Sequence, residues 1–66
     1  MMYIATCRCD IPTTVLIPKG YSVRVMTKDW NSWNWTDVQE ALERDLHVEI
    51  QYSILSTVNW DIVKIS

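Results

Sequence analysis

This chain of 66 residues has few of the residues from which most recognisable functional sites are built. It contains one glycine, one histidine, two cysteines and no phenylalanine. A phosphate-binding loop needs several glycines. A zinc site needs about four ligands, but Cys7 and Cys9 have no second cysteine pair and His47 stands alone. No group is visible that would orient His47 for catalysis. We therefore predict no enzymatic activity, no metal and no cofactor.

Long hydrophobic runs and a strong charge of either sign are also missing. No apolar run approaches the roughly 18 residues of a membrane span, and the N-terminus lacks the charged start and apolar core of a secretory signal. The formal net charge of -2 does not suit binding to a phosphate backbone, and it is too small an acidic excess for a mimic of DNA. We expect a cytoplasmic protein with reduced thiols, without a membrane or nucleic-acid partner.

The pattern of β-favouring residues predicts most of the secondary structure. We expect strands at 2–9, 13–17, 21–27, 47–55 and 60–65. Between the second and third strands, Pro18-Lys19-Gly20 indicates a type I turn that begins at Ile17 and closes a hairpin, with Gly20 in the left-handed region. This hairpin is the clearest local feature outside the helix.

One amphipathic helix is predicted at 36–46. Its apolar residues recur at helical spacing, as Val38, Ala41, Leu42 and Leu46. Thr36 and Gln39 fit a capping box, although Asn34, Ser32 and Asp29 suit the N-cap position equally well. Glu40 and Arg44 are spaced for an ion pair, and His47 is expected to cap the C-terminus.

These elements predict a single small α+β domain over residues 1–66, in the order β-β-β-α-β-β. We expect a mainly antiparallel sheet of four to five strands with one helix packed on one face. A helix about 10–12 Å wide cannot cover both faces of such a sheet. The first and last predicted strands carry apolar residues on both sides. A homodimer is the simplest way to cover the second face.

Three of the four tryptophans lie in "DWNSWNWTD", residues 29–37. If the helix begins at or before Ser32, Trp35 lies on its buried stripe and Trp33 lies on its outward face with Asp37, Glu40 and Arg44, while Trp30 lies near the border. Alternatively, residues 29–35 form a loop that folds back over the sheet and buries all three rings. The sequence leaves both interpretations open.

Protein recognition is the function that these features favour. Tryptophan and arginine are enriched at interface hot spots. We therefore expect a protein-binding surface formed by Trp30, Trp33, Asp37, Glu40 and Arg44. Small acidic chains without motifs often inhibit or modulate a larger protein, as phage-encoded antagonists of host enzymes or defence systems do. The alternatives are a single-strand nucleic-acid module that stacks bases on tryptophan, and a structural subunit of a larger assembly.

Overall fold

The structure is a computed structural model that describes residues 1–27 and 33–65. Within these residues the fold is α+β, as predicted, with five short strands and one α-helix. The order of elements is β-β-β-β-α-β, because a short strand is added before the helix and the strand predicted after it is missing. The sheets are antiparallel.

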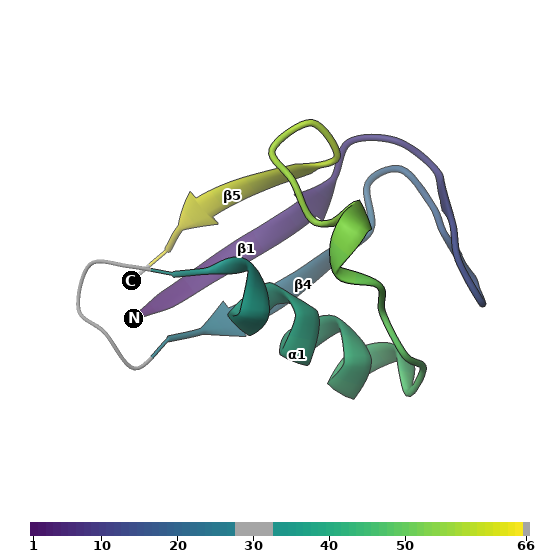
Figure 1. The fold of residues 1–66 in the computed structure, drawn as a ribbon. Helices are drawn as coiled ribbons and strands as arrows, with labels where there is room; N and C mark the ends of the chain where they lie inside the picture. Colours follow the sequence, from purple (N-terminus) through teal and green to yellow (C-terminus); the bar gives the residue numbers. More distant parts are fainter. Residues whose placement is uncertain (28–32, 66) are drawn as a thin grey trace.

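The main sheet has three strands, with the first strand of the chain at its centre. β1 (Met2–Cys7) pairs on one side with β4 (Ser22–Met26) and on the other with β5 (Trp60–Lys64), as Figure 1 shows. Because side chains alternate across a strand, the odd-numbered residues of β1 and β4 are buried on one face. We call this buried face the inner face.

A two-stranded arm extends from the main sheet. Its pairing differs from the hairpin predicted between residues 13–17 and 21–27. β2 (Ile11–Pro12) pairs with β3 (Leu16–Ile17), so β3 does not pair with β4. The predicted turn is present but begins at Pro18, whose carbonyl accepts a hydrogen bond from the Tyr21 N–H at 3.0 Å. Gly20 has a φ of 91°, which side chains disfavour. The turn therefore returns the chain to β1 rather than closing a hairpin.

Helix α1 (Trp35–Leu46) covers the inner face of the sheet and packs mainly against β4. Val38, Ala41 and Leu42 are buried, as their spacing predicted. The helix ends at His47, which is the C-cap in the left-handed region with a φ of 57°. The His47 N–H donates to the Glu43 carbonyl at 2.8 Å. The capping position predicted for His47 is confirmed.

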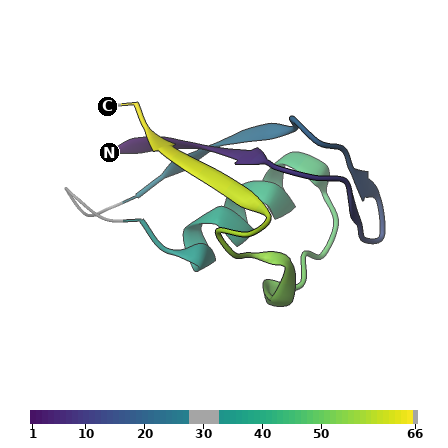
Figure 2. The same cartoon turned by 90° about the horizontal axis from the view of Figure 1, so that it is seen from above.

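The strand predicted at 47–55 is wrong. The alternating apolar residues there form an irregular segment followed by a 3-10 turn, η1 (Tyr52–Ile54). Two helix side chains form hydrogen bonds with the backbone of Ile50 in this segment. The Ile50 N–H donates to the Glu43 carboxylate at 3.0 Å, and the Gln39 amide donates to the Ile50 carbonyl at 2.8 Å. These bonds replace a strand ladder, so the segment packs beneath the sheet without joining it (Figure 2).

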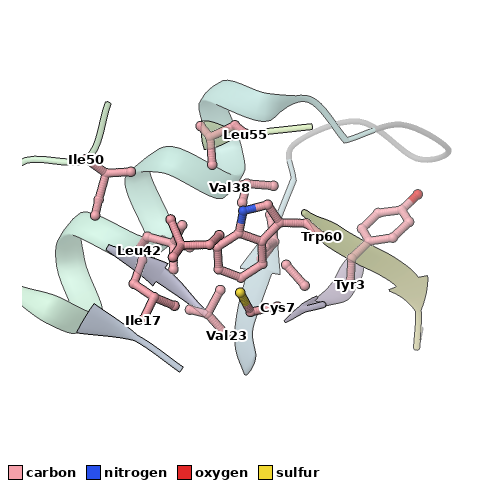
Figure 3. Packing of buried hydrophobic residues seen from close by; sticks show 13 residues of the cluster. Tyr3, Cys7, Ile17, Val23, Val38, Leu42, Ile50, Leu55 and Trp60 are labelled. Carbon is pink, nitrogen blue, oxygen red and sulfur yellow. The ribbon is translucent and has the colours of Figure 1, made fainter. Parts of the chain in front are cut away.

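The core lies between the inner face and α1, and its largest fully buried side chain is Trp60 (Figure 3). The indole comes from the first residue of β5 and lies among residues of the helix, the sheet and the segment after the helix. Its Nε1 donates no hydrogen bond to any described residue. The tryptophan outside the cluster at 29–37 therefore forms the centre of the core.

Candidate functional site

The start of α1 decides where the clustered tryptophans lie. Asn34 is the N-cap, and its side chain accepts the Asp37 N–H at 3.0 Å. In return the Asp37 carboxylate accepts the Asn34 N–H at 3.2 Å, which completes a capping box. The box predicted from Thr36 and Gln39 is therefore wrong, whereas Asn34 was one of the expected alternatives. The helix begins after Trp33, so the condition under which Trp33 was expected on its outward face, a helix start at or before Ser32, is not met.

Trp33 and Trp35 form an aromatic pair at the N-terminal end of α1. Their ring centroids lie 4.8 Å apart with an interplanar angle of 86°, an edge-to-face contact. Trp33 also lies 6.5 Å from the ring of Tyr3 on β1. Both indoles are partly buried against the core. Residues 29–32, on which the interpretation of a loop folded over the sheet depends, lie outside the described residues, and Trp35 belongs to the helix. Trp30 lies outside the described residues.

Three of the helix carboxylates have structural roles. Asp37 caps the helix, and Glu43 accepts the N–H of Ile50. Asp45 accepts a hydrogen bond from the hydroxyl of Tyr21, at the start of the β4 segment. Burial, together with this hydrogen bond and the nearby negative charge, raises the pKa of Tyr21 to about 12. Glu43 and Asp45 thus hold the helix to other segments of the domain, and Asp37 stabilises its first turn.

Glu40 and Arg44 differ from these acids. Both are exposed, and the ion pair expected between them is not formed. Neither side chain has a hydrogen-bond partner among the described residues. We call Glu40 and Arg44, on the exposed side of α1, the helix surface; the Trp33–Trp35 pair lies at the N-terminal end of α1 and packs against the core. Of the five predicted site residues, Asp37 has a structural role, and Glu40 and Arg44 are exposed.

A second surface lies on the side of the sheet opposite the helix, where no element among residues 1–27 and 33–65 covers it (Figure 2). The side chains that alternate with the inner ones point to this side. We call it the open face, and its residues are Met2, Ile4, Thr6, Ser22, Arg24, Met26, Asp61, Val63 and Ile65. Met26, Val63 and Ile65 are 67%, 50% and 47% exposed. Large apolar side chains therefore meet solvent on a regular sheet surface.

The charged groups of the open face lie on its two outer strands. Arg24 is on β4 and Asp61 is on β5, on either side of β1. Arg8, just beyond β1, forms an exposed salt bridge with Asp61 at 3.5 Å. The site residues chosen from the sequence did not include this face. Its signal was present, because the first and last predicted strands carry apolar residues on both sides and Met26 interrupts the polar side of β4.

The two thiols are free and differ in environment. Cys7 is buried on the inner face, and its Sγ donates to the Cys9 carbonyl at 2.6 Å. Burial raises the pKa of the Cys7 thiol above its ordinary value. Cys9 is exposed. Among residues 1–27 and 33–65, no group of three or more histidines, cysteines and carboxylates is placed to hold a metal ion.

A shallow depression of about 350 Å³ lies between the arm and the segment after the helix. It is lined by Pro12, Thr13, Thr14, Glu49, Gln51 and Ile54. Glu49 supplies its single carboxylate, and no buried polar or charged side chain converges on it. The two surfaces described above are therefore better candidates for function than this depression.

Comparison of the chain with protein families, with curated proteins and with solved structures found no match. Within the described part of the chain, no helix has the length and apolar character that crossing a membrane requires. We therefore infer a function from the helix surface and the open face themselves.

Proposed function

We propose that this chain is a cytoplasmic protein-binding module that inhibits or modulates a larger protein by covering part of its surface. The observation that carries the proposal is the state of Glu40 and Arg44. These two helix charges are exposed and have no bond to any described residue, whereas the neighbouring acids Glu43 and Asp45 are held by internal hydrogen bonds. The free thiols Cys7 and Cys9 suit the reducing compartment.

The charge on this side of the molecule points to the chemistry of the partner. Arg44 is the only Lys or Arg in α1 and the segment that follows to residue 49, and it stands among five carboxylates, those of Asp37, Glu40, Glu43, Asp45 and Glu49. Such a surface attracts a protein with a basic patch and speeds its association. The same charge opposes a phosphate backbone, so the nucleic-acid alternative is less favoured.

The Trp33–Trp35 pair, at the N-terminal end of α1, supplies an apolar contact for the proposed partner in addition to the helix surface. The rings are partly buried and held by each other and by Tyr3, so little side-chain freedom would be lost when a partner covers them. An aromatic group fixed before binding, with exposed charges on the same helix, matches the usual composition of a polar, reversible interface.

The test is affinity capture with a charge exchange that preserves the net charge. The immobilised chain is exposed to lysate of its source organism, alongside the double variant Glu40→Arg/Arg44→Glu. A matched control carries Thr14→Ala and Thr57→Ala, two exposed, uncharged positions away from the helix. Quantitative mass spectrometry should find a protein enriched by the wild type and the control and lost with the exchanged variant. Equal enrichment by all three baits, or no enrichment, would overturn the proposal.

A second measurement separates protein binding from nucleic-acid binding. The wild-type chain is titrated with an oligothymidine single strand at low salt while tryptophan fluorescence is followed. We expect no quenching, because the carboxylates on the helix side repel phosphate. Quenching at low salt that is lost at high salt would instead support base stacking.

A further inference from the structure

The open face is apolar at its centre and along one end. Met2 and Ile4 on β1 are partly exposed between Met26 on one side and Val63 and Ile65 on the other. The pairing register places these side chains in two adjacent rows across the sheet. Contiguous exposed apolar side chains of this kind mark an interaction site.

The composition of this face suits a permanent partner better than a transient one. Interfaces between identical subunits are more apolar than interfaces that form and dissociate. The open face also joins opposite charges, with Arg24 on one outer strand and Asp61 on the other. We propose that a second copy of this chain packs on the open face, related by a two-fold axis parallel to β1. This proposal does not depend on the function proposed above.

The axis parallel to β1 places complementary groups opposite each other. It stacks β4 of each copy over β5 of the other, and β1 over β1. Arg24 and Val63 both flank Ile4 in the pairing register, whereas Asp61 flanks Thr6. Arg24 would therefore lie over Val63 of the second copy, with Asp61 roughly 7 Å further along that strand, at two residues of about 3.4 Å each. Stacked sheets are about 10 Å apart, a gap that a long arginine side chain can cross.

The charges also disfavour the other aligned face-to-face arrangement. A two-fold axis perpendicular to the strands would stack β4 on β4 and β5 on β5, so each Arg24 would face the strand that carries the other Arg24, and each Asp61 the strand that carries the other Asp61. Like charges placed near each other oppose association. Of the two arrangements, the parallel axis pairs Arg24 with Asp61 twice, once on each side of the apolar centre.

The resulting dimer would have four layers, with helices outside and two sheets inside. Sheets packed face to face in this way usually cross at about 30°. Both copies of α1 would then lie on the outer surfaces, with Glu40 and Arg44 still exposed. Dimerisation and binding of a target at the helix surface are thus compatible, and different variants disrupt each of them.

The experiment is a charge-reversal series measured by light scattering and sedimentation. The wild type should be a dimer at micromolar to millimolar concentration. Arg24→Glu and Asp61→Arg should each raise the dissociation constant at least tenfold, because each creates repulsion at both symmetry-related contacts. The double variant Arg24→Glu/Asp61→Arg should restore the homodimer. An equimolar mixture of the two single variants should form a heterodimer, because their charges are again complementary.

Controls separate loss of association from loss of folding. Circular dichroism should show that all variants are folded, since both side chains are exposed. Arg8→Ala removes the Arg8–Asp61 salt bridge and should leave the dimer intact, because exposed pairs of this kind contribute little. A wild type that stays monomeric up to millimolar concentration would overturn the proposal. So would a dimer that is unaffected by both single reversals, which would indicate pairing along a sheet edge instead.

Discussion

The two faces of the three-stranded sheet are built from the same strands but have different surroundings. On the inner face, Ala5, Val25 and Trp60 have no exposed surface and pack beneath α1. On the open face, Met26 and Val63 are at least half exposed, although they too are large and apolar. Both faces therefore carry hydrophobic side chains, and only one has a cover.

The difference follows from the number of helices that the chain can form. A single helix about 10–12 Å wide covers roughly the width of the three strands on one side, at about 4.8 Å per strand. Residues 47–55 add to the cover on that same side, because Gln39 and Glu43 hold Ile50 to the helix. The inner face thus supplies the stability of the monomer, and the open face remains for a partner.

The largest difference in stability is expected between two variants, each of which truncates one residue on one face of the sheet. Trp60→Ala removes the largest buried side chain and should lower the free energy of unfolding by about 3–5 kcal/mol. This loss equals about the whole stability that a single core supplies in a domain of this size, so the variant should be largely unfolded. Met26→Ala should change the stability by less than about 0.5 kcal/mol.

Urea denaturation followed by circular dichroism measures both variants. The protein concentration should be low enough to exclude self-association, because any dimer would add a contribution from Met26. If Trp60→Ala kept a cooperative transition close to that of the wild type, the contrast between the faces would be lost. A large loss in Met26→Ala under the same conditions would have the same meaning.

An intermediate effect is expected at the start of the helix that covers the inner face. Asn34→Ala removes the side chain that accepts the Asp37 N–H, and should lower the free energy of unfolding by about 1 kcal/mol. Thr36→Ala is the matched control, because Thr36 lies inside the helix and is exposed. It should change the stability by less than about 0.5 kcal/mol. The reverse ranking of the two variants would place the helix start at Thr36.

The smallest effect on the free energy of unfolding is expected from the hydrogen bond between Tyr21 and Asp45 of α1, and this effect depends on pH. The pKa of Tyr21 is raised from 10.0 to about 12 in the folded protein. The stability from this group is therefore fully present below pH 10 and is lost as the pH rises towards 12. Tyr21→Phe lacks the bond to Asp45 and should be less stable by up to about 1 kcal/mol at pH 8.

The difference between Tyr21→Phe and the wild type should shrink between pH 10 and pH 12, because only the wild type loses this contribution. Urea titrations of both proteins at pH 8, 10 and 11.5 measure the change. Comparing the two cancels the titration of other groups that they share. A difference that stays constant over this range would show that Tyr21 has the same pKa in the folded and unfolded chains.

The features that the sequence predicts well depend on local patterns. Helix α1 follows from the spacing of Val38, Ala41 and Leu42, all of which are buried. Strand β4 follows from the alternation of its residues, and the turn at Gly20 follows from the preference of glycine for a positive φ. In each case a few neighbouring residues fix the conformation, so no knowledge of distant contacts is needed.

The features that the sequence did not predict depend on distant partners. The alternation at 47–55 fits a strand, but Ile50 bonds to helix side chains, and no strand of the sheet pairs with it. Likewise, β4 pairs with β1, which is distant in the sequence, and does not pair with the neighbouring β3. The position of Trp33 depended on which of several residues caps the helix, and one residue, Asn34, decided it.

The pairing of Cys7 with Trp60 has a consequence for synthesis of the protein on the ribosome. β1 is made early and occupies the centre of the sheet, but one of its two neighbours is β5, the last strand described. Until residue 60 has been added, the nascent chain has neither the central indole nor the third strand. The inner face can therefore close only after β5 has been made, and until then Cys7 lacks its partner in the sheet.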